Sequence, residues 1–465
     1  MKTENKNFIF NVVYQLLIYV FPLITIPYVS RVLGVNNIGI YSYTYSIVYI
    51  FMLLAQLGIN NYGNREIARH RDDIIKRSRL FLSIYTFQII TCLLMIVGYC
   101  FFLLSVEPNY STIFYVQSIF LMSVFFDINW FYFGLEKFKI TITRNLIIKV
   151  LSIIFIFLFV KEKDDLWIYS LILAVATLLS QMYLFTILHK YVKFVRFSLI
   201  DVLSHIKGIL VLFIPVVSFA VYRVMDKTMI GFFSSVTELG YYENAERIIN
   251  IPISVIAALG TVMLPRMSYL YNNDNSEVND VLFSSMKLAL ILACIMTCGA
   301  MFISNDISLV LFGAEFAKSG NIIKILSFTI IASAWANVIR TQYLIPRGED
   351  KIYVKSTIGG AITNLICNII FIPIWGAYGA CIGTLVAEFF VALYQSYCVR
   401  KVLPIYKYGV ICLQNFVRCI LIMFIVVLLG NCIESLFVRF VSEIILALVL
   451  FVIFYNRYII KEFLH

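Results

Sequence analysis

The stretch GILVLFIPVVSFAVYRVMDKTMIGFF (Gly208–Phe233) is apolar for most of its length and carries three charged side chains near its end. About 20 apolar residues in a helix are enough to cross a bilayer. Arg223, Asp226 and Lys227 are spaced i, i+3 and i+4, so a helix presents all three on one face. An ionised side chain in lipid costs roughly 2.5 to 3.5 kcal/mol on insertion scales. This face is therefore predicted to point into protein or water.

The next stretch, SSVTELGYYENAERIIN (Ser234–Asn250), repeats this arrangement. Glu243, Glu246 and Arg247 share one face of a helix at this spacing. Two neighbouring spans with charged faces indicate a polar cavity inside a bundle of membrane helices.

The amino-acid composition also indicates a membrane protein. Of the 465 residues, 61% are hydrophobic and only 14% are charged, and the mean hydropathy is +0.90. Such a chain has far more apolar surface than a soluble core uses, so an all-α polytopic membrane protein is predicted. The net charge of +11 indicates basic cytoplasmic loops in such a protein, and no nucleic-acid partner is expected.

Apolar periodicity predicts about fourteen transmembrane helices. In order, they run roughly over 8–30, 38–59, 80–105, 112–133, 142–160, 166–188, 209–233, 240–265, 282–304, 321–345, 353–373, 378–398, 412–432 and 440–460. Lys and Arg concentrate in alternate loops, on the side of the N-terminus, which places both termini in the cytoplasm when the number of spans is even. A faint repeat, with Pro22 and Arg31 matched by Pro215 and Arg223, suggests two parallel six-helix units. The predicted division is a six-helix lobe (1–188), a basic cytoplasmic linker (189–208), a second six-helix lobe (209–400) and an extra helix pair (401–465).

Further ionisable residues fall inside predicted spans, namely Asp127, Lys149 and Glu388. Lys149 and Glu388 lie near the middle of their spans, where exposure to lipid would cost most, so a place in the cavity is expected for them. Asp226 has an alternative role, since it can form a structural ion pair with Arg223 or Lys227.

Other charged residues also leave an alternative open. Arg31, Arg144 and Arg340 lie close enough to an interface for their side chains to snorkel towards water. Glu246 and Arg247 are adjacent in sequence and could simply line the outer mouth of the cavity.

Histidine, tryptophan and cysteine receive ordinary structural roles. The four histidines, His205 among them, fall in polar loops or at the terminus and are predicted to be exposed, so no histidine proton relay is expected. Trp130 is assigned to the membrane interface. Most cysteines lie in apolar runs, so no metal site is expected. The chain has no phosphate-binding loop, HExxH or GxSxG motif, which indicates a transporter without cofactors and not an enzyme.

Four separated segments resemble bacterial polysaccharide-biosynthesis flippases of the multidrug/oligosaccharidyl-lipid/polysaccharide exporter superfamily. They are IPYVSRVLGVNNIGIYSY (Ile26–Tyr43), LGINNYGNREIAR (Leu57–Arg69), DINWFYFGLEKFK (Asp127–Lys139) and MDKTMIGFFSSVTELGYYENAERI (Met225–Ile248). The resemblance implies two six-helix lobes around a central cavity. It also implies alternating access that moves undecaprenyl-diphosphate-linked oligosaccharide repeat units, for O-antigen or capsule, from the inner to the outer leaflet of the bacterial cytoplasmic membrane.

This cargo gives the buried charges specific expected roles. The predicted contacts to the diphosphate or sugars are Arg223, Lys227, Lys149, Arg31 and Arg247, since cations neutralise phosphate charge. Asp127, Asp226, Glu246 and Glu388 are expected either to couple transport to H⁺ or Na⁺ or to hold the basic groups in place. Expected partners are the lipid-linked oligosaccharide, membrane lipids, a polysaccharide polymerase and chain-length machinery.

Three other functions remain open at this point. A multidrug or cation antiporter of the same superfamily would favour carboxylates in its cavity, whereas the deepest charges here are mostly basic. A peptidoglycan-precursor flippase would share the number of spans and the cationic cavity. A membrane-embedded polysaccharide polymerase or transferase would need a catalytic base and usually a large extracytoplasmic loop.

Overall fold

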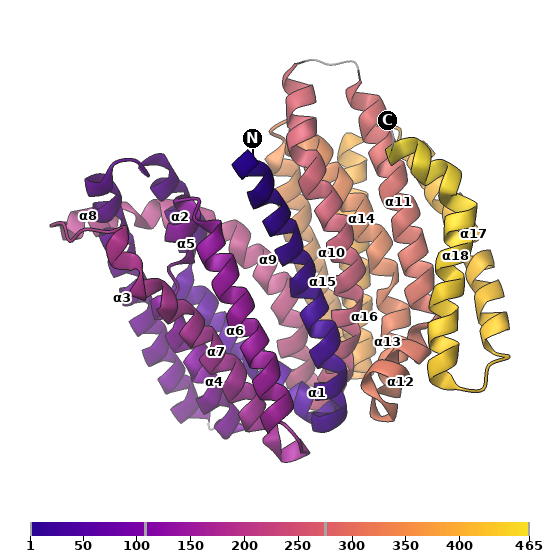
Figure 1. Cartoon of the computed structure of the whole chain (residues 1–465), viewed down its shortest axis with the longest axis horizontal. Coiled ribbons are helices and arrows are strands. Elements are labelled where there is room, and N and C mark those ends of the chain that lie inside the picture. Colours follow the sequence, from indigo (N-terminus) through magenta and orange to yellow (C-terminus); the bar gives the residue numbers. More distant parts are fainter. Residues whose placement is uncertain (1, 107–108, 274–276, 464–465) are drawn as a thin grey trace. The chain divides into compact units, whose positions relative to one another are not determined.

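The computed structural model describes residues 2–106, 109–273 and 277–463. The side chains of 2–23, 106, 215, 218, 219, 221–223 and 456–463 are outside the described set. Within the described residues all regular structure is helical, as predicted (Figure 1). The chain divides into two compact units, residues 1–228 and 229–465. The division into lobes, linker and extra pair predicted from the sequence stays a prediction.

The first unit consists of long helices joined by short ones. Its helices are α1 (Lys2–Gln56), α2 (Ile59–Arg69), α3 (Ile74–Val106), α4 (Ser111–Ser123), α5 (Asn129–Gly134), α6 (Phe138–Phe159), α7 (Leu166–Thr186), α8 (Leu199–Ser204) and most of α9 (Ile206–Phe233). α4 packs against α7 and α1, and α6 packs against α7.

The second unit also consists of long helices joined by short ones. Its helices are α10 (Val236–Asn272), α11 (Val278–Phe302), α12 (Ser304–Phe312), α13 (Ala317–Leu326), α14 (Phe328–Ile339), α15 (Asp350–Trp375), α16 (Ala377–Val399), α17 (Ile405–Gly430) and α18 (Leu436–Phe463). A π-helical turn, η5 (Arg340–Leu344), continues α14. α15 and α16 form a closely packed antiparallel hairpin, and α17 packs against α11.

Twelve stretches of the described chain are long and apolar enough to cross a membrane. The protein is therefore a multi-pass membrane protein. One of the twelve, Ile24–Arg69, includes parts of two predicted spans because α1 continues through both. The seventh predicted span corresponds to α9, in which several side chains are not described. The count of about fourteen spans stays a prediction.

The first two predicted spans are separated by a kink at Gly34, where the backbone adopts φ 76° and ψ 173°. This conformation suits glycine, because other residues pay a steric cost at positive φ. The fourth predicted span is also interrupted. The α4 helix passes through a 3₁₀ turn, and Asp127 then leaves the helical conformation before α5 begins.

The segment after this break is held by a buried cluster that includes Trp130, which has no exposed surface. Trp130 Nε1 donates to Gln88 Oε1 at 3.1 Å, and Gln88 Nε2 donates to the carbonyl oxygens of Val124 and Asp127. The prediction that Trp130 lies at the membrane interface is therefore wrong. Its ring fills the core, and its single polar group finds a buried amide partner, as a buried indole requires.

Candidate functional site

In the first unit the predicted cavity residues lie on three helices. Arg31 is exposed on α1, Lys149 is half-buried on α6, and Lys227 is half-buried on α9. Each of these three cations has at least one interaction partner. The side chain of Arg223 lies outside the described residues, so its role stays a prediction.

Asp226 is buried, with 4% of its surface exposed, and it also has a partner. Two residues further along α9, Thr228 Oγ1 donates to Ser46 Oγ of α1 at 2.9 Å. A buried carboxylate is stable only when it is paired and hydrogen-bonded or protonated. The alternative of a structural ion pair for Asp226 therefore remains open beside a role in coupling.

In the second unit, Arg247 and Glu243 form an ion pair within α10. Arg247 Nε donates to Glu243 Oε1 at 2.9 Å, and the side chains are 23% and 8% exposed. The i, i+4 spacing predicted for this face therefore does bring opposite charges together. Glu246 is half-buried beside Arg247 and, like it, has further interactions.

Glu388 of α16 joins two helices of the second unit. Ser333 Oγ of α14 donates to Glu388 Oε2 at 2.7 Å, and the Glu388 side chain is half-buried. A hydroxyl donor stabilises the ionised form of a carboxylate, and this contact also fixes the direction of the side chain. The coupling role of Glu388 stays a prediction.

Asp127 belongs to a polar network at the break between α4 and α5. It accepts from Gln56 Nε2 at 2.9 Å and from Asn129 Nδ2 at 2.6 Å. Asn129 Oδ1 in turn accepts from Arg144 Nη2 of α6 at 3.0 Å. One amide therefore connects the carboxylate to a buried cation, an arrangement that favours a positioning role for Asp127.

Arg144 is the cation of this network, and only 5% of it is exposed. Besides Asn129, Arg144 donates to Asn145 Oδ1 at 2.8 Å and to Gln181 Oε1 of α7 at 3.4 Å. The expectation that Arg144 snorkels towards water is therefore wrong, because amides from α5, α6 and α7 solvate its guanidinium inside the unit. Arg340, in contrast, is half-buried and lies over the Tyr353 ring, 5.4 Å from its centroid.

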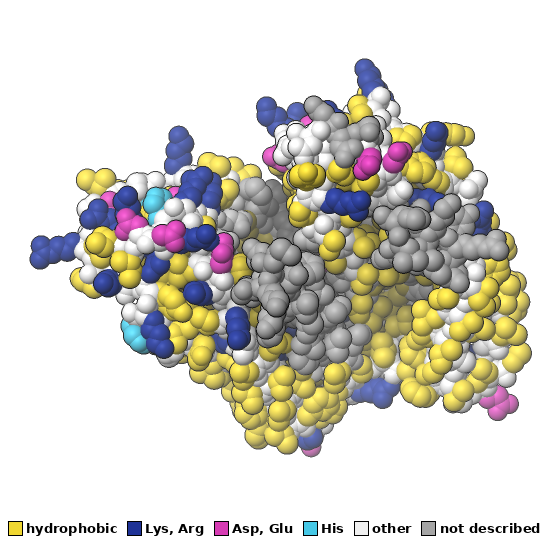
Figure 2. All heavy atoms as spheres, turned by 45° about the horizontal axis from the view of Figure 1, so that its top comes forward, with side chains coloured by type: hydrophobic (Ala, Val, Ile, Leu, Met, Phe, Trp, Pro, Cys, Tyr) yellow, Lys and Arg dark blue, Asp and Glu magenta, His cyan; other side chains and the backbone are white. Residues whose placement is uncertain are grey.

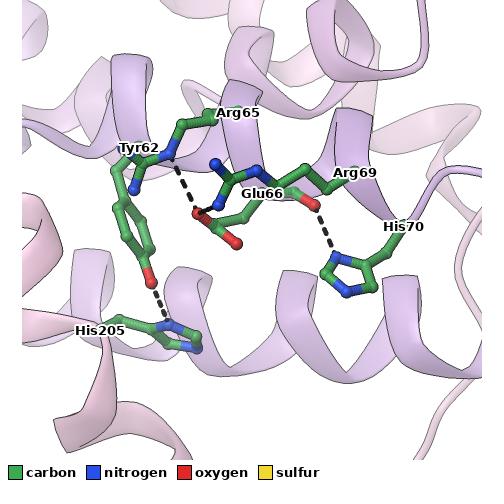
Figure 3. A network of polar contacts seen from close by, with 6 residues as sticks. All are labelled: Tyr62, Arg65, Glu66, Arg69, His70 and His205. Atoms are coloured by element: carbon green, nitrogen blue, oxygen red, sulfur yellow. Dashed lines mark hydrogen bonds and ion pairs between the residues drawn. The ribbon is translucent and has the colours of Figure 1, made fainter.

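His205 contradicts the expectation for the histidines, since only 6% of it is exposed. Its Nδ1 lies 2.8 Å from Tyr62 Oη of α2, and its Nε2 lies 2.8 Å from Ser83 Oγ of α3. Figure 3 shows Tyr62 reaching His205 from the helix that also carries Arg65, Glu66 and Arg69. The histidine therefore ties the start of α9 to α2 and α3.

The contacts of Ser83 indicate which ring nitrogen of His205 donates a hydrogen bond and which accepts one. Ser83 Oγ donates to the carbonyl oxygen of Leu80 at 3.1 Å, which leaves its oxygen to accept from His205 Nε2–H. Nδ1 can then accept from the Tyr62 hydroxyl, so neutral His205 satisfies both ring nitrogens. Burial lowers the pKa of His205, and the nearby carboxylates of Glu66 and Asp201 only partly oppose this effect.

We expect acid to destabilise the folded protein because His205 becomes protonated. Its pKa is lower in the folded state than the ordinary value of about 6.5, so the unfolded chain binds the proton more readily. The stabilising contribution of neutral His205 is therefore complete above about pH 6.5, and it is lost as the pH falls towards the pKa of His205 in the folded protein. The midpoint of thermal unfolding in detergent, measured from pH 8 to pH 5, should fall more for wild type than for His205→Gln. His189→Gln, at an exposed position, should follow wild type, and parallel curves for wild type and His205→Gln would contradict the assignment.

Basic side chains are concentrated at one end of the first unit. Figure 2 shows dark blue side chains gathered at this end, on the left, above a flank where hydrophobic side chains predominate. The loop between α7 and α8 is attached there, since Arg77 Nη2 donates to the carbonyl oxygen of Tyr191 at 2.8 Å and Lys193 N donates to Ser78 Oγ at 3.0 Å. A basic end beside an apolar flank is typical of the cytoplasmic side of a membrane protein.

A family model described as "Polysaccharide biosynthesis protein" matches residues 5–271, which is more than half of the 465-residue chain. The chain belongs to the polysaccharide biosynthesis protein family. This membership confirms the resemblance to polysaccharide flippases of the multidrug/oligosaccharidyl-lipid/polysaccharide exporter superfamily. The match covers α1 to most of α10 and so includes every predicted cation site.

Two relatives agree with this membership, and a solved structure shares the fold. A Shigella dysenteriae protein named "Putative O-antigen transporter" is 24% identical over 395 residues, which cover 82% of this chain and 96% of that protein. An Escherichia coli (strain K12) protein of the same name is 22% identical over 421 residues, with 86% and 99% covered. The structure "Lipid II flippase MurJ, inward closed conformation" has a TM-score of 0.74 at 18% identity and covers 97% of this chain and 100% of its own. At this identity the likeness shows the fold, which confirms the predicted all-helical membrane architecture.

Proposed function

We propose that this member of the family is a flippase that moves undecaprenyl-diphosphate-linked oligosaccharide repeat units from the inner to the outer leaflet by alternating access. The observation that carries the proposal is the family match, together with near full-length relatives named as O-antigen transporters. The fold shared with a lipid-linked precursor flippase is compatible with the same kind of cargo.

The charged side chains give the proposal a physical basis. A diphosphate carries about two negative charges, and moving them through hydrocarbon without compensation would be prohibitive. Lys149 and Lys227 are half-buried cations on helices of the first unit, and Arg31 and Arg247 add two more. Such donors can replace the water around a phosphate, while the lipid tail stays in the bilayer.

The energy source is proposed to be a proton or sodium gradient or the membrane potential. One charge moved through 100 mV supplies about 2.3 kcal/mol, which is enough to bias a conformational cycle. Asp226, Glu246 and Glu388 are the carboxylates proposed to bind the coupling ion, and Asp127 is proposed to hold Arg144 in place. The protein would lie in the bacterial cytoplasmic membrane with both termini in the cytoplasm, beside a polymerase and chain-length machinery.

The proposal is tested by translocation in proteoliposomes. The vesicles contain the purified protein and a fluorescent undecaprenyl-diphosphate oligosaccharide in one leaflet, and a membrane-impermeant quencher reports arrival in the other leaflet. We expect translocation well above that of protein-free vesicles and of vesicles with a heat-inactivated sample. The absence of translocation for every lipid-linked oligosaccharide tried, with folded protein present, would overturn the proposal.

The same vesicles separate the alternatives. Transport of an organic cation without movement of the lipid would indicate a multidrug antiporter. Preference for a peptidoglycan precursor over a polysaccharide repeat unit would indicate a precursor flippase. A longer or newly linked glycan in the recovered lipid would indicate a polymerase or transferase.

A further inference from the structure

The first unit contains a pocket of about 440 Å³ that none of the proposed cargo residues lines. It lies between α6 and α7 at the end of the unit where basic residues gather. Six of its lining residues define its chemistry: Lys139, Arg144, Lys190, Tyr183, Ile147 and Ile148. Within the described part of the chain, the lining includes three cations and no carboxylate. Its volume lies within the range of about 300 to 1,000 Å³ that is usual for small-molecule sites.

The guanidinium of Arg144 is held by hydrogen bonds, whereas the two lysines are exposed. Arg144 is buried, and its contacts to Asn129, Asn145 and Gln181 set the plane of the guanidinium. Lys139 comes directly after the start of α6, and Lys190 ends the 3₁₀ turn after α7. Both lysines are exposed, so their ammonium groups can reach a ligand at the mouth of the pocket from opposite sides.

The pocket opens onto an apolar flank of the same two helices. Along α6, Ile147 is 56% exposed, and Leu151, Ile154 and Leu158 are exposed about one, two and three turns further along the helix. On α7, Leu179 and Met182 are exposed as well. In a membrane protein, exposed large apolar side chains in such rows face acyl chains. The cations of the pocket therefore adjoin an apolar surface that lipid tails would cover in a bilayer.

We propose that this pocket, the α6–α7 pocket, binds the phosphate of an anionic glycerophospholipid. The phosphate would lie among Lys139, Arg144 and Lys190, and the acyl chains would follow the apolar residues of α6 and α7. Three positive charges without a carboxylate in the lining complement a net negative head group and disfavour one that carries its own ammonium. Basic pockets between membrane helices on the cytoplasmic side bind anionic lipid head groups in this way.

The choice of a glycerophospholipid rests on the combination of the two surfaces. A free phosphate would satisfy the cations but would leave the adjoining apolar rows without a role. The cargo proposed above also carries phosphate, but its cation contacts are assigned to other residues, so the lipid site does not depend on the proposed function.

The test is native mass spectrometry of the full-length protein in detergent with added lipid. Wild type should bind phosphatidylglycerol at least tenfold more tightly than phosphatidylethanolamine. Lys139→Ala/Lys190→Ala should lower the apparent affinity for phosphatidylglycerol by roughly 10- to 30-fold, since each cation near an anionic head group contributes to binding. The matched control is Lys137→Ala/Lys193→Ala, which removes the same charge from two exposed positions near the same end outside the pocket lining and should bind as wild type does.

Three results would overturn the proposal. Equal loss of affinity in both double variants would show a general effect of surface charge. Equal binding of phosphatidylethanolamine would remove the role of net charge. Displacement of the bound lipid by millimolar inorganic phosphate alone, or by undecaprenyl diphosphate at a tenth of the phosphatidylglycerol concentration, would assign the pocket to a different ligand.

Discussion

The double variant Lys149→Ala/Lys227→Ala is expected to abolish translocation of a lipid-linked oligosaccharide. Each single substitution is expected to slow this translocation by roughly 10- to 100-fold. A hydrogen bond from a charged donor contributes about 1.5 to 3 kcal/mol, and about 1.4 kcal/mol corresponds to a factor of ten. The loss is expected in the rate of head-group crossing, because only there does the diphosphate lack the solvation of bulk water. The measurement is the proteoliposome quenching assay.

Conservative and distant replacements make this prediction specific. Lys149→Arg keeps the charge and should retain most of the activity. Lys401→Ala/Lys407→Ala removes two charges from exposed positions between α16 and the first turn of α17 and should transport like wild type. Thermal unfolding must be similar in all variants, so that a loss of fold is not counted as a loss of transport. Wild-type rates in the Lys149→Ala/Lys227→Ala protein would refute the assignment of these cations.

The membrane fold could be predicted because hydropathy is a property of whole segments. A run of 20 apolar residues leaves a helix as the favoured way to satisfy its backbone in lipid. The interruptions could not be predicted in the same way, because an average over a segment does not register one backbone angle. The kink at Gly34 and the non-helical Asp127 each depend on a single residue inside an apolar stretch.

The buried polar residues show a different limit. Arg144 is near an end of its predicted span, and His205 is in a polar loop, so local sequence indicates exposure for both. The residues that bury them come from elsewhere, since Ser83 is 122 positions from His205 and Gln181 is 37 positions from Arg144. A single sequence does not show which amide or hydroxyl will lie next to a charge. The i, i+4 pair of Glu243 and Arg247 was predictable because both lie on one helix.

Arg439 and Asp306 form the ion pair that joins α18 to α12. Arg439 Nε donates to Asp306 Oδ2 at 2.6 Å and Nη2 donates to Oδ1 at 2.5 Å, with the aspartate side chain 10% exposed. Glu443 is buried one turn further along α18 and interacts electrostatically with both residues. Arg439 is hydrogen-bonded to Asp306, and the carboxyl group of Glu443 lies near both without a hydrogen bond to the arginine, so the effects of single substitutions are expected to be unequal.

Arg439→Ala is expected to destabilise the second unit by about 3 to 5 kcal/mol, because it leaves Asp306 and Glu443 close together without a cation. Asp306→Ala should cost less, since Glu443 remains near Arg439 and can compensate part of its charge. Asp306→Leu/Arg439→Met/Glu443→Gln should recover much of the loss, because it removes all three charges, and replacing a buried ionic group by uncharged groups of similar size is often neutral. The midpoints of thermal unfolding in detergent measure this order. If Asp306→Ala proves as damaging as Arg439→Ala, Glu443 does not share the arginine, and if the triple variant is the least stable, the charged group stabilises the fold beyond the cost of burying its charges.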